Sequence, residues 1–207
     1  MSPLPAELTS HWRQRPGRAP GRELYHWHML FHDQPEVRSA VAAAQRKLAG
    51  RPEVDIVPLQ WLHVTTLLTG FVDEVPGEKI SAMAQEASLR LGRLAPIPIK
   101  LGFIYYDTEA VVLPVEPFGA LDPVHRALTE AAVAAGCDAR DDSSPWLPHL
   151  SIAYANRTAP AAPVIAALGR SLGPVECAIK SASLVAQTQV GRTWQWRPIA
   201  EAHLRGL

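Results

Sequence analysis

Hydrophobic and polar residues alternate with a period of two in several short segments of the chain, and this period is typical of β-strands with one buried face. In the segment 24–31, Trp27 and Met29 lie on one face, which we assign to the core, whereas His26 and His28 lie on the other. The strands predicted in this way are 24–31, 54–58, 61–69, 97–106, 110–115, 146–155, 179–189 and 193–204.

Longer segments between these strands have the composition of helices. A proline–glutamate pair opens an alanine-rich helix at residue 35, and Gly50 is its expected end. Further helices are predicted over 78–94, 121–135 and 164–172, and 138–145 is a polar loop. Strands and helices in this order predict an α+β fold with mainly antiparallel pairing.

The order of the elements repeats along the chain with an offset of 86 residues. This offset superimposes His63 on His149, Thr65 on Ser151, and the helix before Gly50 on the helix before Gly136. Few residues are identical between the halves, so the repeat is one of architecture. It predicts two similar lobes related by a pseudo-twofold axis, with the two histidine-bearing strands side by side in a central cleft.

The composition of the 207 residues narrows the possible classes of protein. Hydrophobic residues make up 47% and charged residues 19%, which is typical of a globular domain. The formal net charge is zero, so duplex DNA or long duplex RNA is not an expected partner. Two cysteines cannot form a disulfide framework or a cysteine zinc site. There is no apolar run of membrane-spanning length and no secretory signal, so we expect a soluble, cytoplasmic protein without membrane contacts.

The first 22 residues differ from the rest in composition. They carry Arg13, Arg15, Arg18 and Arg22 among prolines and glycines, which predicts a flexible basic arm. An alternative is that this arm guides an anionic substrate electrostatically. Residues 23–207 are expected to form one bilobal domain, and we expect a monomer.

The chemistry suggested by the sequence centres on two short motifs, His63-Val64-Thr65 and His149-Leu150-Ser151. Residues i and i+2 of a strand lie on one face, about 6.6 Å apart, so two imidazoles and two hydroxyls could converge on one tetrahedral anion. The hydroxyls can donate hydrogen bonds to phosphate oxygens. With a pKa near 6.5, one histidine can accept a proton while the other donates one, and this chemistry needs no metal.

These motifs and their surroundings, WLHVTTLLTGF and PHLSIAYAN, resemble the paired motifs of the two-histidine (2H) phosphoesterase superfamily. The superfamily includes 2′-5′ RNA ligase-like proteins and cyclic phosphodiesterases, and the resemblance extends over roughly residues 22–204. It implies a bilobal fold with helices outside and a central cleft, without a cofactor. His63 and His149 would be the acid–base pair, with Thr65 and Ser151 binding phosphate. The implied substrates are 2′,3′-cyclic phosphates at RNA ends or on small nucleotides, with 2′-5′ ligation as the reverse reaction.

The sequence departs from the common family pattern a few residues after each motif. Many members have a basic residue there, whereas this chain has Leu68 and Tyr154. The Tyr154 hydroxyl could contact the substrate, although simple alternation places it on the face opposite His149. Trp61 shares the face of His63 and is a candidate for stacking on a base.

Three alternatives remain open at this stage. His26 and His28 could face the substrate, be structural, or ligate zinc in a metal hydrolase, although zinc needs three or four ligands. The chain could also be a non-catalytic nucleotide- or RNA-binding module. Finally, His63 and His149 could be ordinary core histidines.

Overall fold

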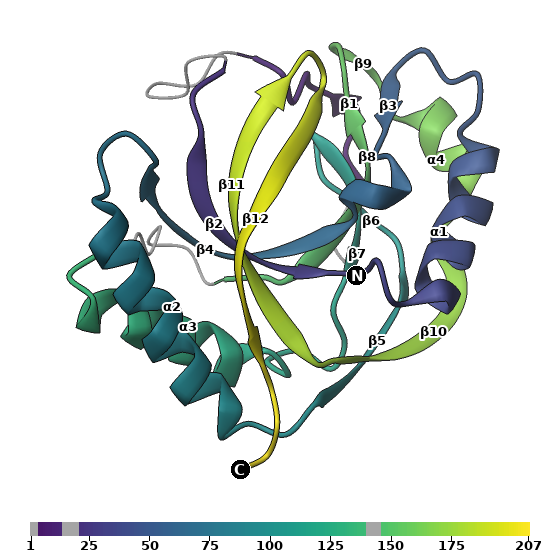
Figure 1. Cartoon of the computed structure of the whole chain (residues 1–207). Coiled ribbons are helices and arrows are strands. Elements are labelled where there is room, and N and C mark those ends of the chain that lie inside the picture. Colours follow the sequence, from purple (N-terminus) through teal and green to yellow (C-terminus); the bar gives the residue numbers. More distant parts are fainter. Residues whose placement is uncertain (1–3, 14–20, 140–145) are drawn as a thin grey trace.

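The computed structural model describes residues 4–13, 21–139 and 146–207. Its centre is an antiparallel sheet with the strand order β12-β11-β2-β4-β8-β7-β6, and β3 pairs with β8 (Figure 1). These strands are β2 (Leu24–Leu30), β3 (Val54–Ile56), β4 (His63–Phe71), β6 (Tyr105–Tyr106), β7 (Ala110–Pro114), β8 (His149–Ala155), β11 (Ser181–Val190) and β12 (Thr193–His203). Two smaller sheets pair β1 (Glu7–Leu8) with β9 (Ala159–Pro160) and β5 (Ile97–Phe103) with β10 (Ser171–Ile179).

The helices form two pairs outside the central sheet. They are α1 (Pro35–Lys47), α2 (Gly77–Gly92), α3 (Asp122–Ala134) and α4 (Ala162–Leu168), with a 3₁₀ turn, η1 (Leu59–Trp61). Figure 1 shows α1 beside α4, and α2 beside α3. The 86-residue offset relates α1 to α3 and α2 to α4, so each pair combines one helix from each half of the chain. The predicted α+β, bilobal fold is confirmed, and the two halves are interleaved through one sheet.

The helices bury one apolar face against the sheet. In α1 that face is formed by Val37, Val41 and Ala44, which belong to the same buried cluster as Trp27 and Met29 of β2, and none of the five is more than 1% exposed. Trp27 is therefore in the core, as predicted. Within the described residues, no helix is long and apolar enough to cross a membrane.

Strand β10 was not predicted, and neither were the two-residue strands β1 and β9. Residues 171–179 form β10, an edge strand that pairs with β5, whereas the sequence predicted a helix end followed by a loop. Most side chains of β10 are partly or fully exposed, and Gly173 and Pro174 interrupt its pattern, so no alternation marks it as a strand. The pairing is close, since a Cβ on Gly102 would lie 2.8 Å from the Gly173 carbonyl oxygen.

The described part of the N-terminal segment packs on the domain. Strand β1 pairs with β9, Leu8 is 1% exposed, and the His11 amide donates to the Ala155 carbonyl at 2.9 Å. For residues 4–13 the prediction of a flexible arm is therefore corrected, because apolar side chains and backbone hydrogen bonds hold them in place. Arg15 and Arg18 lie outside the described residues, and Arg22 pairs with Asp73 and Glu74.

Two β-bulges occur at equivalent places in the two halves. In the pairing of β2 with β4, His28 lies opposite Thr65 and Trp27 opposite Leu67, so Thr66 is the extra residue. In the pairing of β7 with β8, the register shifts between Ser151 and Ala153 in the same way. A bulge reverses the alternation of the residues that follow it. Leu68 and Tyr154 therefore lie on the faces of His63 and His149, and the opposite placement expected for Tyr154 is wrong.

The bulge in β8 is held by a buried glutamine of α1. The Gln45 side-chain amide donates to the carbonyls of Val57 and Ile152, at 2.7 and 3.0 Å. Ile152 is the extra residue of the bulge, and Val57 precedes η1. Gln45 thus joins α1 to the segments that lead to His63 and Ser151.

We expect Gln45→Leu to lower the free energy of unfolding by about 1–3 kcal/mol, because a buried carbonyl is left without its donor. Urea unfolding measures this loss. The matched control is Gln85→Leu, at an exposed position of α2, where a change below about 0.5 kcal/mol is expected. Equal effects of the two substitutions would show that Gln45 does not anchor the bulge.

Candidate active site

The two histidine-bearing strands are adjacent and antiparallel. Val64 of β4 pairs with Leu150 of β8, and both side chains are fully buried on the helix side of the sheet. One residue further in each direction, this register places His63 opposite Ser151, and Thr65 opposite His149. All four polar side chains therefore share the other face, around the pseudo-twofold axis between Val64 and Leu150.

The two imidazoles are held in the same way. Nδ1 of His63 lies 2.9 Å from the carbonyl oxygen of Trp61, and Nδ1 of His149 lies 2.8 Å from that of Leu147. A carbonyl only accepts, so Nδ1 carries the hydrogen in both rings. The Nε2 atom of each ring then carries a lone pair that can accept a proton when the ring is neutral, and it carries a proton that it can donate when the ring is protonated. Each histidine can thus exchange a proton through Nε2.

The two histidines differ in environment. His63 is 9% exposed, and burial, together with the nearby His149, lowers its pKa to about 4. His149 is exposed at the start of β8. His63 is therefore neutral near pH 7, whereas the His149 ring is open to solvent. The nearly symmetric fold gives the two histidines unequal chemistry.

His28 lies behind His63 rather than in the open part of the site. It is fully buried, its ring is 4.3 Å from that of His63, and its Nε2 is 2.8 Å from Oε1 of Gln187. Burial, then the charges of His63 and His26, lower the pKa of His28 well below its usual range. The substrate contact considered for His28 stays a prediction, and in the structure its ring contacts His63.

His26 is 6% exposed, and its ring lies 5.3 Å from that of His28. Both histidines come from the strand face that the sequence indicated, so the alternation of β2 is confirmed. Within the residues that the structure describes, no three histidine, cysteine, aspartate or glutamate side chains cluster as potential metal ligands.

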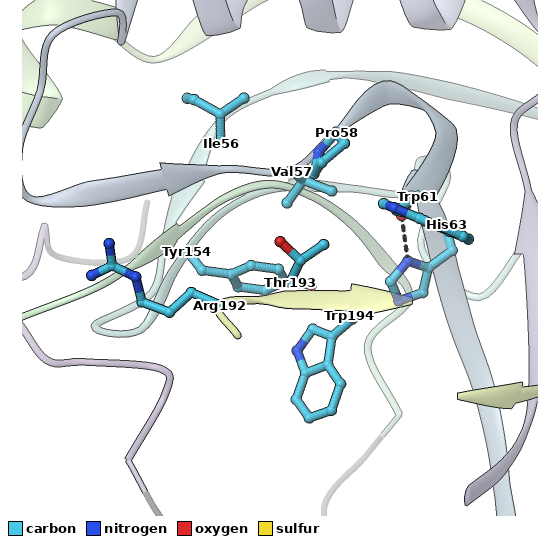
Figure 2. Close-up of a pocket in the computed structure, with 9 residues that line it drawn as sticks. All are labelled: Ile56, Val57, Pro58, Trp61, His63, Tyr154, Arg192, Thr193 and Trp194. Atoms are coloured by element: carbon cyan, nitrogen blue, oxygen red, sulfur yellow. Dashed lines mark hydrogen bonds between the residues drawn. The ribbon is translucent and has the colours of Figure 1, made fainter. Parts of the chain in front are cut away.

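A pocket opens beside His63 (Figure 2). It is lined by Ile56, Val57, Pro58, Trp61, His63, Tyr154, Arg192, Thr193 and Trp194. Trp61 is in η1 rather than on the strand, and its ring lies 4.7 Å from that of Trp196, which also contacts His63. Burial raises the pKa of Tyr154 to about 12, whereas its hydrogen bond with Ser151 acts in the opposite direction. Two of the predicted substrate-binding residues, Trp61 and Tyr154, thus line the pocket next to His63.

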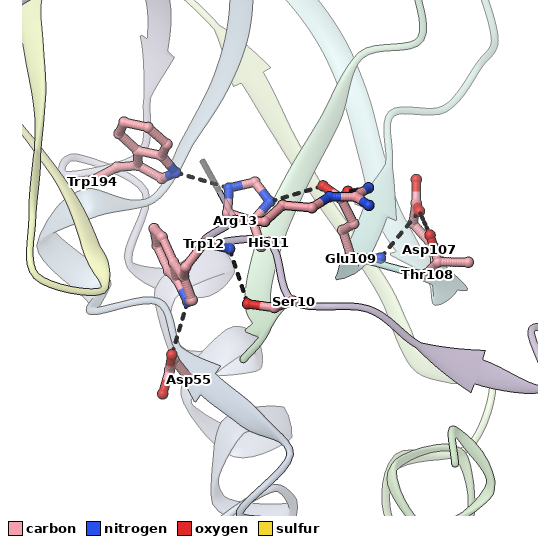
Figure 3. A network of polar contacts seen from close by, with 9 residues as sticks. All are labelled: Ser10, His11, Trp12, Arg13, Asp55, Asp107, Thr108, Glu109 and Trp194. Carbon is pink, nitrogen blue, oxygen red and sulfur yellow. Dashed lines mark hydrogen bonds and ion pairs between the residues drawn. The ribbon is translucent and has the colours of Figure 1, made fainter. Parts of the chain in front are cut away.

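The N-terminal segment contacts two residues that line this pocket, Tyr154 and Trp194, and Figure 3 shows His11 beside Trp194. The His11 ring stacks on Tyr154 at 4.2 Å, and the Trp194 indole donates to Nε2 of His11 at 3.0 Å. Trp12 donates to Asp55 at 2.9 Å. No local sequence pattern indicated these contacts, because they join segments up to 183 residues apart.

Trp146 lies three residues before His149 and contacts β4 and α3. Its indole donates to the Thr65 carbonyl at 3.1 Å, and its ring stacks on His125 at 4.6 Å. Trp146 therefore links α3 to β4, beside the second histidine.

Burial of two neutral histidines predicts a pH-dependent stability. In the unfolded chain the pKa of both histidines is near 6.5. In the folded protein the pKa is about 4 for His63 and well below 6.5 for His28. Between these values the unfolded state binds more protons, so stability is full above pH 6.5 and falls as the pH drops toward 4. From pH 7 to pH 5 we expect a loss on the order of 2 kcal/mol from His63 alone.

Urea unfolding at several pH values measures this loss. His63→Gln cannot titrate, so its profile should be flatter than that of the unmodified protein in this window. Parallel profiles would contradict a depressed pKa at His63. His203→Gln, at an exposed position, serves as the control and should leave the slope unchanged.

Comparison with known proteins agrees with this geometry. The model of a family described as the 2′-5′ RNA ligase superfamily matches residues 32–191, which contain both motifs. No curated protein matches the chain in sequence.

Solved structures share the fold over most of the chain. The structure of TT0787 of Thermus thermophilus is 24% identical, with a TM-score of 0.65, covering 89% of this chain and 98% of that one. E. coli LigT in complex with NADP+ is 16% identical, with a TM-score of 0.68, covering 89% and 99%. The MHV ns2 PDE domain is 13% identical, with a TM-score of 0.54, covering 88% and 100%. At these identities the likeness shows the fold.

Proposed function

The chain belongs to the 2′-5′ RNA ligase superfamily, and from this membership we propose that it is a metal-independent phosphodiesterase that opens 2′,3′-cyclic phosphates of RNA ends or small nucleotides. The observation that carries the proposal is the placement of both motifs around one axis, with each Nδ1 fixed by a carbonyl. Each histidine thereby presents Nε2 for proton transfer. LigT structures contain NADP+, ATP and 3′-AMP, which supports a nucleotide as substrate.

The unequal burial of the two histidines supports the following roles in hydrolysis. Neutral His63 accepts a proton from water as the water oxygen forms a bond to phosphorus. The bond from phosphorus to one ribose oxygen breaks, and protonated His149 gives its proton to that oxygen. The products are a phosphomonoester and a free ribose hydroxyl. With a ribose hydroxyl in place of water, the same two proton transfers would form a phosphodiester, which would be 2′-5′ ligation, the reverse reaction.

Thr65 and Ser151 are proposed to hold the phosphate. Each hydroxyl lies on the reactive face opposite one of the histidines and can donate to a nonbridging oxygen. These donors are stabilising as negative charge shifts in the transition state, because they are already oriented by the strands.

The test is a panel of 2′,3′-cyclic nucleotides and RNA ends, incubated with a chelator and followed by phosphorus NMR. We expect turnover to a single phosphomonoester isomer, with a rate that is unchanged by the chelator. Binding without turnover of any cyclic phosphate would instead identify a non-catalytic module. Loss of activity with chelator, restored by a divalent metal, would identify a metal hydrolase.

A further inference from the structure

The positions that follow the two motifs lack a positive charge. After each bulge, Leu68 and Tyr154 face the site, where a basic side chain could have contacted the substrate. Among the residues that line the pocket beside His63, Arg192 is the one that carries a permanent positive charge. It lies in the tight turn between β11 and β12, next to Gly191, whose φ is +58°.

Arg192 is oriented by a carboxylate at the end of the pocket. Its Nε lies 3.2 Å from Oδ2 of Asp55, and the Arg192 side chain is 59% exposed. Asp55 also accepts hydrogen bonds from Trp12, at 2.9 Å, and from Asn156, at 3.1 Å. Trp12 and Asn156 thus stabilise the Asp55 carboxylate together with Arg192. The ion pair between Arg192 and Asp55 uses the Nε atom of the guanidinium. Within the described residues, its two Nη groups make no hydrogen bond, so they can bind an anion as a fork.

The location of Arg192 separates it from the reacting phosphate. Figure 2 shows the guanidinium at the end of the pocket away from His63, with the Tyr154 ring between them. The strand pairing agrees with this placement of Arg192, because its partner Asp55 lies opposite Tyr154 in the pairing of β3 with β8. A phosphate held between His63 and His149 is therefore at one end of the pocket, while Arg192 is at the other.

The side chains between the two ends offer surfaces that a nucleoside can contact. Val57 and Pro58 offer an apolar surface, and Tyr154 and Trp194 offer aromatic surfaces. A ribose whose 2′ and 3′ oxygens lie at His63 directs its 5′ oxygen away from that histidine.

We propose that Arg192 binds a 5′-phosphoryl group on the nucleoside whose 2′,3′-cyclic phosphate is opened at His63 and His149. This inference rests on the proposed function and narrows its substrate class. The terminal nucleotide of an RNA carries such a 5′ phosphodiester, and a nucleoside 5′-phosphate carries a monoester. A nucleoside 2′,3′-cyclic phosphate with a free 5′-hydroxyl carries neither, so it is the poorer substrate.

The experiment compares adenosine 2′,3′-cyclic phosphate bearing a 5′-hydroxyl, the same nucleotide with a 5′-phosphate, and a dinucleotide ending in the same cyclic phosphate. We expect kcat/KM to be about ten- to a hundredfold higher for the two substrates with a 5′-phosphoryl group. Arg192→Ala should remove this preference. It should leave kcat/KM for the substrate with a 5′-hydroxyl unchanged. Arg192→Lys, which keeps the charge without the fork, should retain part of it. The control is Arg93→Ala, at an exposed position near the end of α2.

Each other outcome overturns the inference. Equal kcat/KM for all three substrates would do so while leaving the proposed function in place. An equal loss on all three in Arg192→Ala would assign the side chain to the pocket structure or to the reacting phosphate. The guanosine counterparts of the three substrates are compared as well, and a higher kcat/KM for guanosine than for adenosine, whatever the 5′ group, would assign Arg192 to a base edge.

Binding separates the inference from the proposed function. If no cyclic phosphate is turned over, the proposed function fails, and equilibrium binding of the same three compounds decides the inference. Tighter binding of the 5′-phosphorylated compounds that is lost in Arg192→Ala supports it, and equal binding overturns it. Thermal unfolding of Arg192→Ala should stay close to that of the unmodified protein, because Asp55 keeps its contacts with Trp12 and Asn156.

Discussion

Alanine in place of His63 or His149 is expected to slow the opening of a 2′,3′-cyclic phosphate by about 10²–10⁴-fold, since each substitution removes one of two proton transfers. The protein should still fold, because neither ring is part of the apolar core on the helix side of the sheet. The measurement is kcat/KM at pH 7 for both variants. His203→Ala, which changes an exposed histidine at the end of β12, is the matched control and should retain full activity.

A second substrate tests the assignment of base and acid. An aryl phosphodiester has a phenolate leaving group that needs little protonation, so loss of the acid should matter much less for it than for a ribose oxygen. His149→Ala should therefore recover most of its activity on the aryl ester, whereas His63→Ala should not. Recovery in His63→Ala alone would exchange the two roles, and no recovery in either variant would contradict a dedicated acid.

The sequence predicted the main elements and the adjacency of the two motif strands because both depend on local pattern. The strand alternation around His63 and His149, and the 86-residue offset between them, were sufficient to place the two strands together. The antiparallel register of Val64 with Leu150 gives this offset its physical meaning, since it is the pairing that a twofold axis through the strands requires.

The side of the sheet on which Tyr154 lies was not predictable from alternation. Its orientation depends on one extra residue at Ile152, and no feature of β8 in the sequence marks that bulge. The structural cause is partly remote, because the Gln45 side chain holds the Ile152 carbonyl from α1. Bulges beside active sites commonly redirect a side chain in this way.

Arg192 and the N-terminal segment were missed for a related reason. A turn arginine resembles any solvated charge until Asp55 and the pocket are placed beside it. Prolines and arginines in the first 22 residues suggested a flexible arm, whereas Leu8, His11 and Trp12 find their partners in distant strands. Contacts between distant segments have no local signature, so only the fold reveals them.

Removal of the Ser151 hydroxyl is expected to weaken catalysis without abolishing it. A hydrogen bond to a charged group contributes about 1.5–3 kcal/mol, so Ser151→Ala and Thr65→Ala should each lose on the order of ten- to a hundredfold in kcat/KM. Thr65→Ser keeps the hydroxyl and should stay within a few-fold of the unmodified protein. Each histidine variant should lose more in kcat/KM than the hydroxyl variant of the same motif.

This ordering distinguishes phosphate binding from nucleophilic catalysis. A covalent mechanism requires His63, the histidine opposite Ser151, to activate the serine oxygen rather than water. The serine would then form the bond to phosphorus, and its loss would be as severe as the loss of a histidine. Ser151→Ala with no more activity than His149→Ala, together with a phosphoserine trapped in the unmodified protein, would therefore replace the proposed mechanism with a nucleophilic one. A tenfold loss without any covalent adduct would support a Ser151 hydroxyl that holds the phosphate while the two histidines transfer the protons.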